Sequence, residues 1–354
     1  MRTLHASALL LTLVSSALAQ GMTFSRIAPK GSEFFEGNSA SDIMLGNWAP
    51  QTRTQQVDNN LVGTNVPLIR FLGWRRNGSS NSGAAKVTDL TILMGHADYN
   101  AITNTFATNY KSAAQTVFTK KPVSLPDWNG ASGSVPSPCD LVVPLDLPFV
   151  YNNTDALVWE VLNENNPMGI YTQDWVSSMT HTYGDYSTNL GGGCATGNGQ
   201  MKHRVALRAN ATVLEMGYDV AAAPSNAPLT LLLGISDPAA NLPGLCGTIH
   251  CLPLTTLGMG NSGAAGELAL SFPISTPWNP SFAGAVLYTQ VVAPDATQTG
   301  LPLALSNGLR SSAPAGNAVG TTPINVKRIY HTTSVTTPTG TGPSISGVVT
   351  LYGF

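Results

Sequence analysis

The feature that most constrains the fold is a succession of short apolar runs, each soon ended by glycine, proline or asparagine. In segment 85–97, AKVTDLTILMGHA, polar and apolar side chains alternate with a period of two residues. The two faces would carry, respectively, Val87, Asp89 and Thr91, and Thr88, Leu90 and Ile92. This alternation is typical of a half-buried β-strand, and stretches of strong helix formers are missing after residue 20. We therefore expect an all-β protein.

The strand-like runs fall into two series, separated by the glycine-, serine- and asparagine-rich segment 184–200. Turn-bounded strands in such series predict a sandwich or jelly roll. We expect two consecutive β-sandwich, jelly-roll-like domains at residues 20–188 and 189–316, and a strand-forming C-terminal extension at 317–354. The chain ends in ISGVVTLYGF (345–354), which we expect either to add a strand to the second domain or to reach a neighbouring molecule.

The first twenty residues have the pattern of a secretory signal peptide. Arg2 supplies the basic start, an apolar stretch runs from Ala8 to Val14, and Ala17–Ala19 forms a cleavage site with small residues at both ends. The apolar stretch is shorter than the roughly 20 residues of a spanning helix. We expect a signal peptide at residues 1–19, cleaved after Ala19. The product would be secreted to the extracellular space or cell surface, without a transmembrane segment.

The low content of charged residues excludes some partners. Charged residues make up 10% of the chain and hydrophobic ones 43%, whereas about 25% charged is average. That combination argues against disorder. The formal net charge of −2 removes the electrostatic basis for binding nucleic acid. Arg70, Arg75 and Arg76 lie around Trp74, and we interpret them as a strand end whose long side chains reach solvent.

The four cysteines are those of a protein from an oxidising compartment: Cys139, Cys194, Cys246 and Cys251. Four cysteines allow three pairings, and spacing alone does not select one. No CxxC motif and no histidine pair at zinc-ligand spacing occurs in the sequence, so we expect two disulfides rather than a metal centre.

Segment 158–165, VWEVLNEN, brings two carboxylates together, as glycoside hydrolases do. On a β-strand Glu160 and Glu164 share a face but lie about 13 Å apart, too far for either hydrolytic mechanism. We interpret them as part of a solvated strand face. The sequence also lacks the G-x-S-x-G turn of a serine hydrolase. We therefore expect no catalytic residue, no cofactor and no enzyme activity.

Several polar clusters resemble weak metal sites. His96 and Asp98 stand at the end of a predicted strand, and the segments 151–155 (YNNTD) and 236–241 (SDPAAN) carry carboxylate and amide oxygens. Such segments also form ordinary turns, which is our interpretation, and a structural calcium ion stays the one candidate metal. His250 lies between two cysteines, and we interpret it as a surface loop residue.

Carbohydrate binding requires exposed aromatic faces beside planar polar groups. The tryptophans that stand next to asparagine or aspartate are Trp48, Trp128, Trp175 and Trp278. We treat these four as candidate glycan-stacking residues. The alternative is that they plug the ends of the sandwiches.

Gln290 stands inside GAVLYTQVVAPD (284–295), which otherwise reads as a buried strand. With a period of two residues it shares a face with Tyr288 and Val292. Its amide has donors and an acceptor to satisfy, so we expect bonds to backbone at a sheet end or across to SNGLR (306–310). A structural role is therefore favoured over binding or reaction.

Several segments together resemble a family of secreted bacterial proteins of unassigned activity, common in planctomycete-type genomes. The first-half segments are TRTQQVDNN, VPLIRFLGWRRNG, DLTILMGHADYN and LVVPLDLPFVYNNTDALVWEV. The second-half motifs, those of a domain often found with the first, are GGC at 192–194, LLLGIS at 231–236, GAVLYTQ at 284–290 and LALSNGLR at 303–310. The resemblance covers about residues 50–314 and leaves the C-terminal segment unexplained.

The resemblance implies tandem β-sandwich domains on an exported protein, and no catalytic motif. It also implies a disulfide between Cys194 and Cys251, which leaves Cys139 with Cys246. A tight Cys246–Cys251 loop around GTIH is the competing pairing. Segment 150–161 departs from the family, which has Asp-Pro and Gly-Asn there, so the resemblance does not define that turn.

Two functions fit these features. The favoured one is a secreted, non-catalytic structural or adhesive surface protein that self-associates through edge strands. The alternative is an extracellular carbohydrate-binding module or polysaccharide-processing protein. The expected partners are accordingly a second copy of the chain, a cell surface or a polysaccharide.

Overall fold

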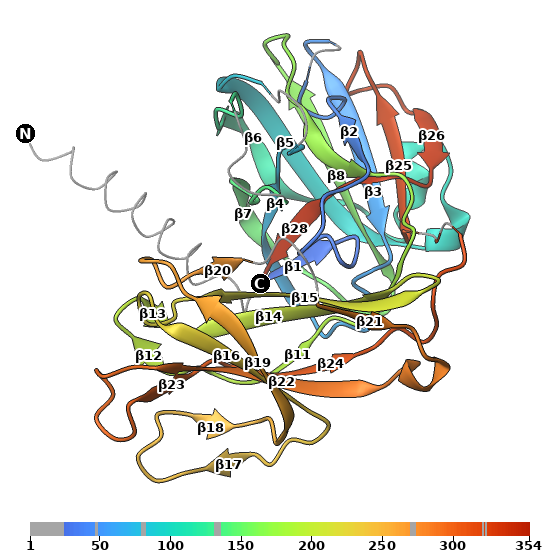
Figure 1. Ribbon diagram of the computed structural model, residues 1–354. Coiled ribbons are helices and arrows are strands. Elements are labelled where there is room, and N and C mark those ends of the chain that lie inside the picture. The colour runs from blue at the N-terminus through green and yellow to red at the C-terminus, as the bar shows by residue number, and fades with distance from the viewer. Residues whose placement is uncertain are drawn as a thin grey trace, which may run out of the picture. The chain divides into compact units, whose positions relative to one another are not determined.

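The computed structural model describes residues 25–46, 49–78, 83–130, 136–269, 274–320, 322 and 324–354. The prediction of an all-β protein is confirmed, because this part of the chain consists of antiparallel sheets joined by loops and short 3-10 turns (Figure 1). None of the helices described is long and apolar enough to cross a membrane. The expected signal peptide at residues 1–19 lies outside the described residues, as does Trp48.

The chain divides into two compact units. One unit is formed by His181–Val319 and is called the continuous unit here; Ser25 also belongs to it. The other, the discontinuous unit, combines Arg26–Thr180 with Gly320–Phe354. The boundary near residue 180 lies close to the linker seen in the sequence, whereas the C-terminal segment belongs to the unit that is first in sequence.

The expectation for the C-terminal segment is therefore wrong. It neither extends the sheet of the second half nor projects as an arm. Strand β25 (Val326–His331) pairs with β3 (Thr52–Asp58), and β28 (Thr350–Gly353) pairs with β4 (Leu68–Trp74). In Figure 1 these red strands run beside the blue N-terminal ones. Backbone groups of β3 and β4 need partners inside a packed unit, and the last strands of the chain supply them.

Three sheets make up the discontinuous unit. Their strand orders are β26-β25-β3-β8-β5-β6, β1-β28-β4-β7 and β2-β9-β27. The bounds of the strands not yet given are Ser25–Ala28 (β1), Ser39–Ser41 (β2), Lys86–Ala97 (β5), Gln115–Leu125 (β6), Leu141–Val150 (β7), Ala156–Glu164 (β8), Gln173–Val176 (β9), Thr341–Ser344 (β26) and Gly347–Val348 (β27). Two short 3-10 turns, η2 (Tyr99–Ala101) and η3 (Phe106–Asn109), lie between β5 and β6.

The two larger sheets of this unit face each other across buried aromatic residues. Trp74 of β4 meets Trp159 of β8 edge to face, with ring centroids 5.8 Å apart, and neither side chain is exposed. The indole NH of Trp159 donates to the hydroxyl of Tyr352 at 3.0 Å, and that hydroxyl donates to Asp58 at 3.0 Å. A buried indole and phenol usually find such partners, so β28 is fastened to both β8 and β3.

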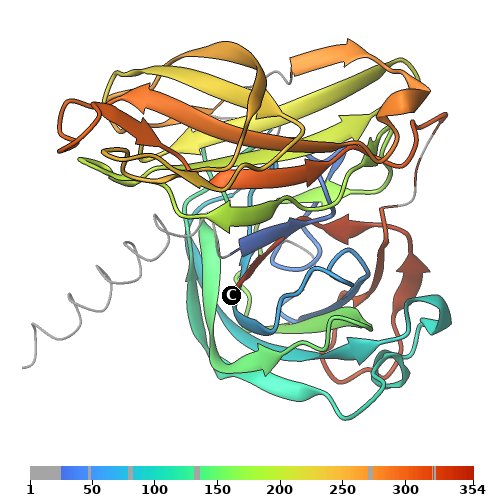
Figure 2. The ribbon, with the colours of Figure 1, turned by 90° about the horizontal axis from the view of Figure 1, so that it is seen from below.

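The continuous unit is a sandwich of two sheets, which lie one above the other in Figure 1 and overlap in the view of Figure 2. One sheet has the order β10-β14-β15-β20, with β21 also paired to β15; the other has the order β11-β24-β22-β16-β19, with β23 paired to β22. The strands run Thr182–Tyr183 (β10), Thr188–Gly191 (β11), Lys202–Ala209 (β14), Val213–Ala221 (β15), Pro228–Gly234 (β16), Pro253–Asn261 (β19), Leu268–Ala269 (β20), Ile274–Pro277 (β21), Val286–Pro294 (β22), Leu303–Leu305 (β23) and Gly308–Ser312 (β24). Small pairs are formed by β12 (Ala195–Thr196) with β13 (Gly199–Gln200) and by β17 (Ala240–Asn241) with β18 (Thr248–Ile249), and η4 spans Pro280–Phe282.

Side chains from both sheets form the core of the continuous unit. Leu207 and Met216 come from one sheet, and Leu231 and Val291 from the other, within one buried cluster. Alternate residues of each strand point into this cluster, as in other aligned sandwiches. The alternation predicted for 85–97 in the other unit is confirmed as well, because the face with Leu90 is buried along β5.

The cysteine pairing differs from the expected one. The disulfide joins Cys194 and Cys246, with 5.4 Å between their Cα atoms, while Cys139 and Cys251 are not disulfide-bonded. The pairing of Cys194 with Cys251 is therefore wrong, as are the pairing of Cys139 with Cys246 and the Cys246–Cys251 loop. The reason is the course of the chain: β18 separates the two nearby cysteines, and Cys251 lies against β22, where its thiol donates to the carbonyl of Tyr288 at 3.2 Å.

Candidate functional site

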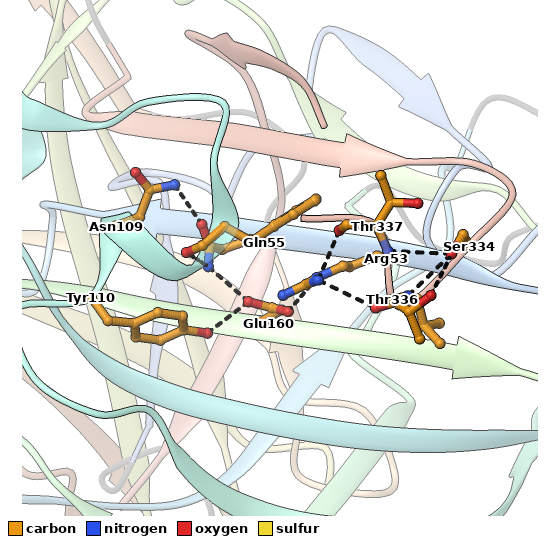
Figure 3. Close-up of polar contacts among 10 residues, drawn as sticks. Arg53, Gln55, Asn109, Tyr110, Glu160, Ser334, Thr336 and Thr337 are labelled. Carbon is orange, nitrogen blue, oxygen red and sulfur yellow. Dashed lines mark hydrogen bonds and ion pairs between the residues drawn. The ribbon is translucent and has the colours of Figure 1, made fainter. Parts of the chain in front are cut away.

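The strongest concentration of polar side chains surrounds Glu160 in the discontinuous unit (Figure 3). Glu160 of β8 lies directly opposite Gln55 of β3 in the strand register. Arg53, two residues before Gln55, lies on the same face of β3. Tyr110 comes from the segment just after η3. Glu160 is 1% exposed, so the expectation that it lies on a solvated strand face is wrong.

Both oxygens of the Glu160 carboxylate are occupied. Arg53 donates from Nε to Oε1 at 2.6 Å. Gln55 donates from Nε2 to Oε2 at 2.7 Å, and the hydroxyl of Tyr110 donates to the same oxygen at 2.9 Å. A carboxylate can be buried only if it is paired and hydrogen-bonded, and these three donors meet both requirements.

A second set of contacts fixes the donors themselves. The amide of Asn109 donates to the side-chain oxygen of Gln55 at 2.7 Å. Arg53 donates to the carbonyl oxygens of Val335 and Thr337 at 3.3 and 3.0 Å, and its guanidinium carbon lies 4.0 Å from the ring centroid of Phe106. The cluster therefore ties the 334–337 turn and η3 to the sheet.

The electrostatics of the cluster keep Tyr110 protonated. Burial raises the pKa of the Tyr110 phenol well above 10, and the neighbouring Glu160 carboxylate raises it further. A protonated phenol acts as a donor toward the carboxylate. Both carboxylate oxygens already accept hydrogen bonds, and the side chain is buried. This arrangement is suited to holding segments together and not to proton transfer with a substrate.

Glu164, the second glutamate of the pair that resembles a hydrolase site, lies outside the Glu160 cluster. Glu164 is partly exposed and forms an ion pair with Lys120 at 3.0 Å. The sequence pattern pointed to the two glutamates but not to Arg53, Gln55 and Tyr110, which complete the cluster. The available signal was the run TRTQQ in β3, where polar residues occupy both faces of a strand that is buried on both.

Gln290 forms the predicted bonds to backbone. Its side chain is 1% exposed and bonds only to backbone: its oxygen accepts from the amide of His250 at 2.9 Å. Its nitrogen donates to the carbonyls of Thr248 and Ser306 at 2.9 and 3.0 Å. The expected bond toward the segment 306–310 is therefore present.

His250 differs from the surface loop residue that was expected, because it is 9% exposed. Its Nδ1 lies 3.1 Å from a carboxylate oxygen of Asp237. A second histidine of this unit, His203, is buried between two hydroxyls, with Nε2 3.0 Å from Thr289 Oγ1 and Nδ1 2.9 Å from Ser306 Oγ. Burial lowers the pKa of His203 to about 4, so it stays neutral and serves as a hydrogen-bonding side chain of the core.

The tryptophans named as glycan-stacking candidates are mostly buried, which corrects that expectation. Trp128 is 0% exposed and stacks on Tyr171 with ring centroids 4.2 Å apart. Trp175 is 7% exposed, and the guanidinium of Arg328 covers its ring at 3.4 Å from the centroid. Trp278 is partly buried and meets Phe282 edge to face. These tryptophan rings pack against neighbouring rings and a guanidinium of the protein, so their faces are not available for stacking on a sugar.

A hollow of about 450 Å³ lies beside Lys86 and is lined by Asn129, Met168 and Ile170 among others. The Lys86 amine donates to the carbonyl of Pro167 at 3.2 Å and lies 5.3 Å from the ring centroid of Tyr171. Burial lowers the pKa of Lys86 to about 8. Because Trp128 and Tyr171 are fully buried, neither offers this hollow a ring face for stacking on a sugar.

In the two loops considered for calcium, the carboxylate oxygens accept hydrogen bonds from nearby groups of the protein. Asp237 contacts His250 and accepts from the amide of Ala239 at 2.8 Å. In the other loop, Asp155 accepts from the side-chain amide of Asn152 at 3.0 Å. Within the described ranges, no group of three or more histidine, cysteine, aspartate or glutamate side chains is placed to hold a metal ion.

His96 and Asp98 also have local partners. His96 Nε2 accepts from the amide of Asn152 at 3.1 Å, and its ring stacks on Tyr151. Asp98 caps η2 by accepting from the amide of Asn100 at 2.9 Å. The two side chains thus serve different turns.

Comparisons of the chain with protein-family models, with curated proteins and with solved structures found no match.

Proposed function

We propose that this chain is a non-catalytic structural or adhesive protein of the cell exterior that associates with further copies of itself. The observation that carries the proposal is the closed hydrogen bonding of Glu160, whose two oxygens are taken by Arg53, Gln55 and Tyr110. A general acid or base must reach the proton that it transfers, and this carboxylate reaches only its structural partners.

Other features support the extracellular setting. The Cys194–Cys246 disulfide belongs to an oxidising compartment, and the N-terminal sequence up to Ala19 has the pattern of a cleaved signal peptide. The resemblance of residues 50–314 to secreted bacterial β-sandwich proteins is part of the same proposal. The buried hydrogen-bond networks inside the units and the low content of charged residues, 10% of the chain, are compatible with a stable protein of the cell surface.

The carbohydrate-binding alternative has less support. Trp128 and Trp175, two of the residues that would stack on a sugar, are buried. Within the described residues, Trp278 is the remaining candidate, and it is itself packed against Phe282.

One experiment tests the proposal in two arms. Sedimentation velocity of the full-length secreted chain over a wide concentration range should show mass increasing with concentration. Pull-down on a panel of insoluble polysaccharides, with a turnover assay on the same panel, should show no retention and no product. A chain that stays monomeric throughout would refute the proposed self-association. Retention by one polysaccharide that is lost in Trp278→Ala would favour a glycan-binding protein instead.

A further inference from the structure

Strand β19 forms one edge of the larger sheet in the continuous unit. It pairs with β16 on one side, and in the described part of the chain no strand pairs with its other side. Such an edge presents unpaired backbone NH and C=O groups that accept a further strand. At nine residues, Pro253–Asn261, it is long enough to offer several consecutive pairs.

The edge lacks charged side chains and internal proline, two of the devices that prevent pairing. Its sequence, PLTTLGMGN, has no charged residue and has proline only at its first position. The long terminal strands of the other unit are different, because β6 carries Lys120 and Lys121 followed by Pro122, and β7 carries Asp146 between two prolines. Lysine and proline on edge strands block edge-to-edge association, and the central part of β19 has neither residue, unlike β6 and β7.

Apolar side chains gather at the first end of β19. Leu254 is 70% exposed, and Leu252 and Ile235 are 57% and 63% exposed. The amide of Leu252 bonds to the carbonyl of Ser236 at 3.1 Å, which places Leu252 beside the residue that follows Ile235. Exposed apolar groups that are contiguous mark interaction sites more often than isolated ones do.

The register of β19 limits where a partner strand can fit. Irregularities between Leu229 and Thr230 and between Leu233 and Gly234 of β16 leave Met259 and Leu254 of β19 as extra residues. Between them, residues 255–258 pair regularly with β16. Bulges twist an edge locally, so this central segment is the part that can receive another strand.

We propose that β19 is the self-association edge, and that its occupant is β19 of a second copy, paired antiparallel with Thr256 opposite Thr256. A two-fold axis normal to the sheet keeps each face of the two sheets on the same side, and it closes the assembly as a dimer. An uncharged strand brings no like charges together when it meets itself. The proposal rests on the self-association in the proposed function and names the strand responsible.

The test uses the full-length secreted chain in sedimentation equilibrium. Thr256→Lys places two lysines directly opposite each other, and Thr256→Glu places two glutamates there. Each variant alone should weaken dimerisation by about tenfold or more, since a cross-strand pair is lost and like charges face each other. An equimolar mixture of the two variants should recover a dimer, because lysine then faces glutamate.

The matched control is Thr276→Lys, at an exposed threonine of β21 on the other sheet of the same unit. It should dimerise like the wild type, and all variants should show wild-type circular dichroism and a Tm close to that of the wild type. A wild-type dimer that Thr256→Lys leaves intact would overturn the assignment to β19 while the proposed function stands. A wild type that is monomeric at every concentration would overturn both, and failure of the mixture to recover a dimer would overturn the two-fold pairing.

Discussion

Tyr110 donates a hydrogen bond of 2.9 Å to Glu160 of β8, a carboxylate that is almost completely buried. The bond links the segment after η3 to the centre of the large sheet. Its strength comes from the charge of the acceptor, since hydrogen bonds to charged groups stabilise more than neutral ones. The raised pKa of Tyr110 guarantees that the proton is present at physiological pH.

Tyr110→Phe should therefore destabilise the protein without touching the ion pair between Arg53 and Glu160. Loss of one donor to a buried carboxylate is expected to lower the free energy of unfolding by about 1.5–3 kcal/mol. Urea denaturation at pH 7 measures it. The control is Tyr99→Phe, whose ring lies under Lys327 and should change the free energy by less than about 0.5 kcal/mol. Equal losses in the two variants would contradict a special role for Tyr110.

The sequence predicts strands well where the alternation of apolar and polar residues, which is a local pattern, is clear. The alternation of Val87 to Ile92 indicated a half-buried strand, and β5 has one buried face in the structure. The Glu160 cluster was not predicted, because its members come from three separate segments. Whether Arg53 and Gln55 face solvent or a second sheet depends on what covers β3, and that covering includes the turn at 334–337, which is distant in the sequence.

Gln290→Leu tests the structural role of a polar residue in a buried strand. The leucine cannot replace the amide, so the NH of His250 and the carbonyls of Thr248 and Ser306 lose their partner. Unsatisfied buried groups cost about 1–3 kcal/mol each, and we expect a loss of about 3 kcal/mol or more in the free energy of unfolding. Gln115→Leu, at an exposed position of β6, is the matched control. A fully stable Gln290→Leu protein that had lost self-association would instead indicate a binding role.

The buried His203 should make stability depend on pH. Burial lowers its pKa from 6.5 to about 4. As the pH falls below about 6.5, the unfolded chain takes up a proton that the folded chain refuses until about pH 4. The free energy of unfolding should therefore decrease between these two pH values, by about 3 kcal/mol, and level off below them.

The comparison with His203→Gln isolates this contribution from the other titrating groups. Urea unfolding at several pH values between 4 and 8 should show a steeper decrease for the wild type than for the variant. The variant must first be shown to fold at pH 7. Parallel curves for the two proteins would mean that His203 takes up its proton in the folded state as readily as in the unfolded one.

The C-terminal strands show a second limit of sequence reasoning. The apolar spacing of ISGVVTLYGF indicates a strand, and β28 forms within it, but the partner of a strand is not written in its own residues. Tyr352 bonds to Asp58, 294 positions earlier. A contact of such sequence separation depends on the global packing of the unit, which the local pattern does not contain.

The cysteine pairing was mispredicted for a related reason, and it leads to two further predictions. Cys246 and Cys251 are so close in sequence that either satisfies the spacing from Cys194. The structure selects Cys246, while burial and the nearby Asp237 raise the pKa of the Cys251 thiol to about 11. A non-reducing peptide map should therefore contain a Cys194–Cys246 peptide, and native Cys251 should resist iodoacetamide at pH 8 but react after unfolding.

Removing the disulfide should also cost stability. The bond closes a loop of 52 residues, for which the chain-entropy estimate is about 4 kcal/mol. The double variant Cys194→Ser and Cys246→Ser should accordingly unfold at a lower urea concentration. The control, Cys139→Ser, keeps the disulfide and should unfold near the wild-type midpoint. A map that joined Cys194 to Cys251 would refute this assignment.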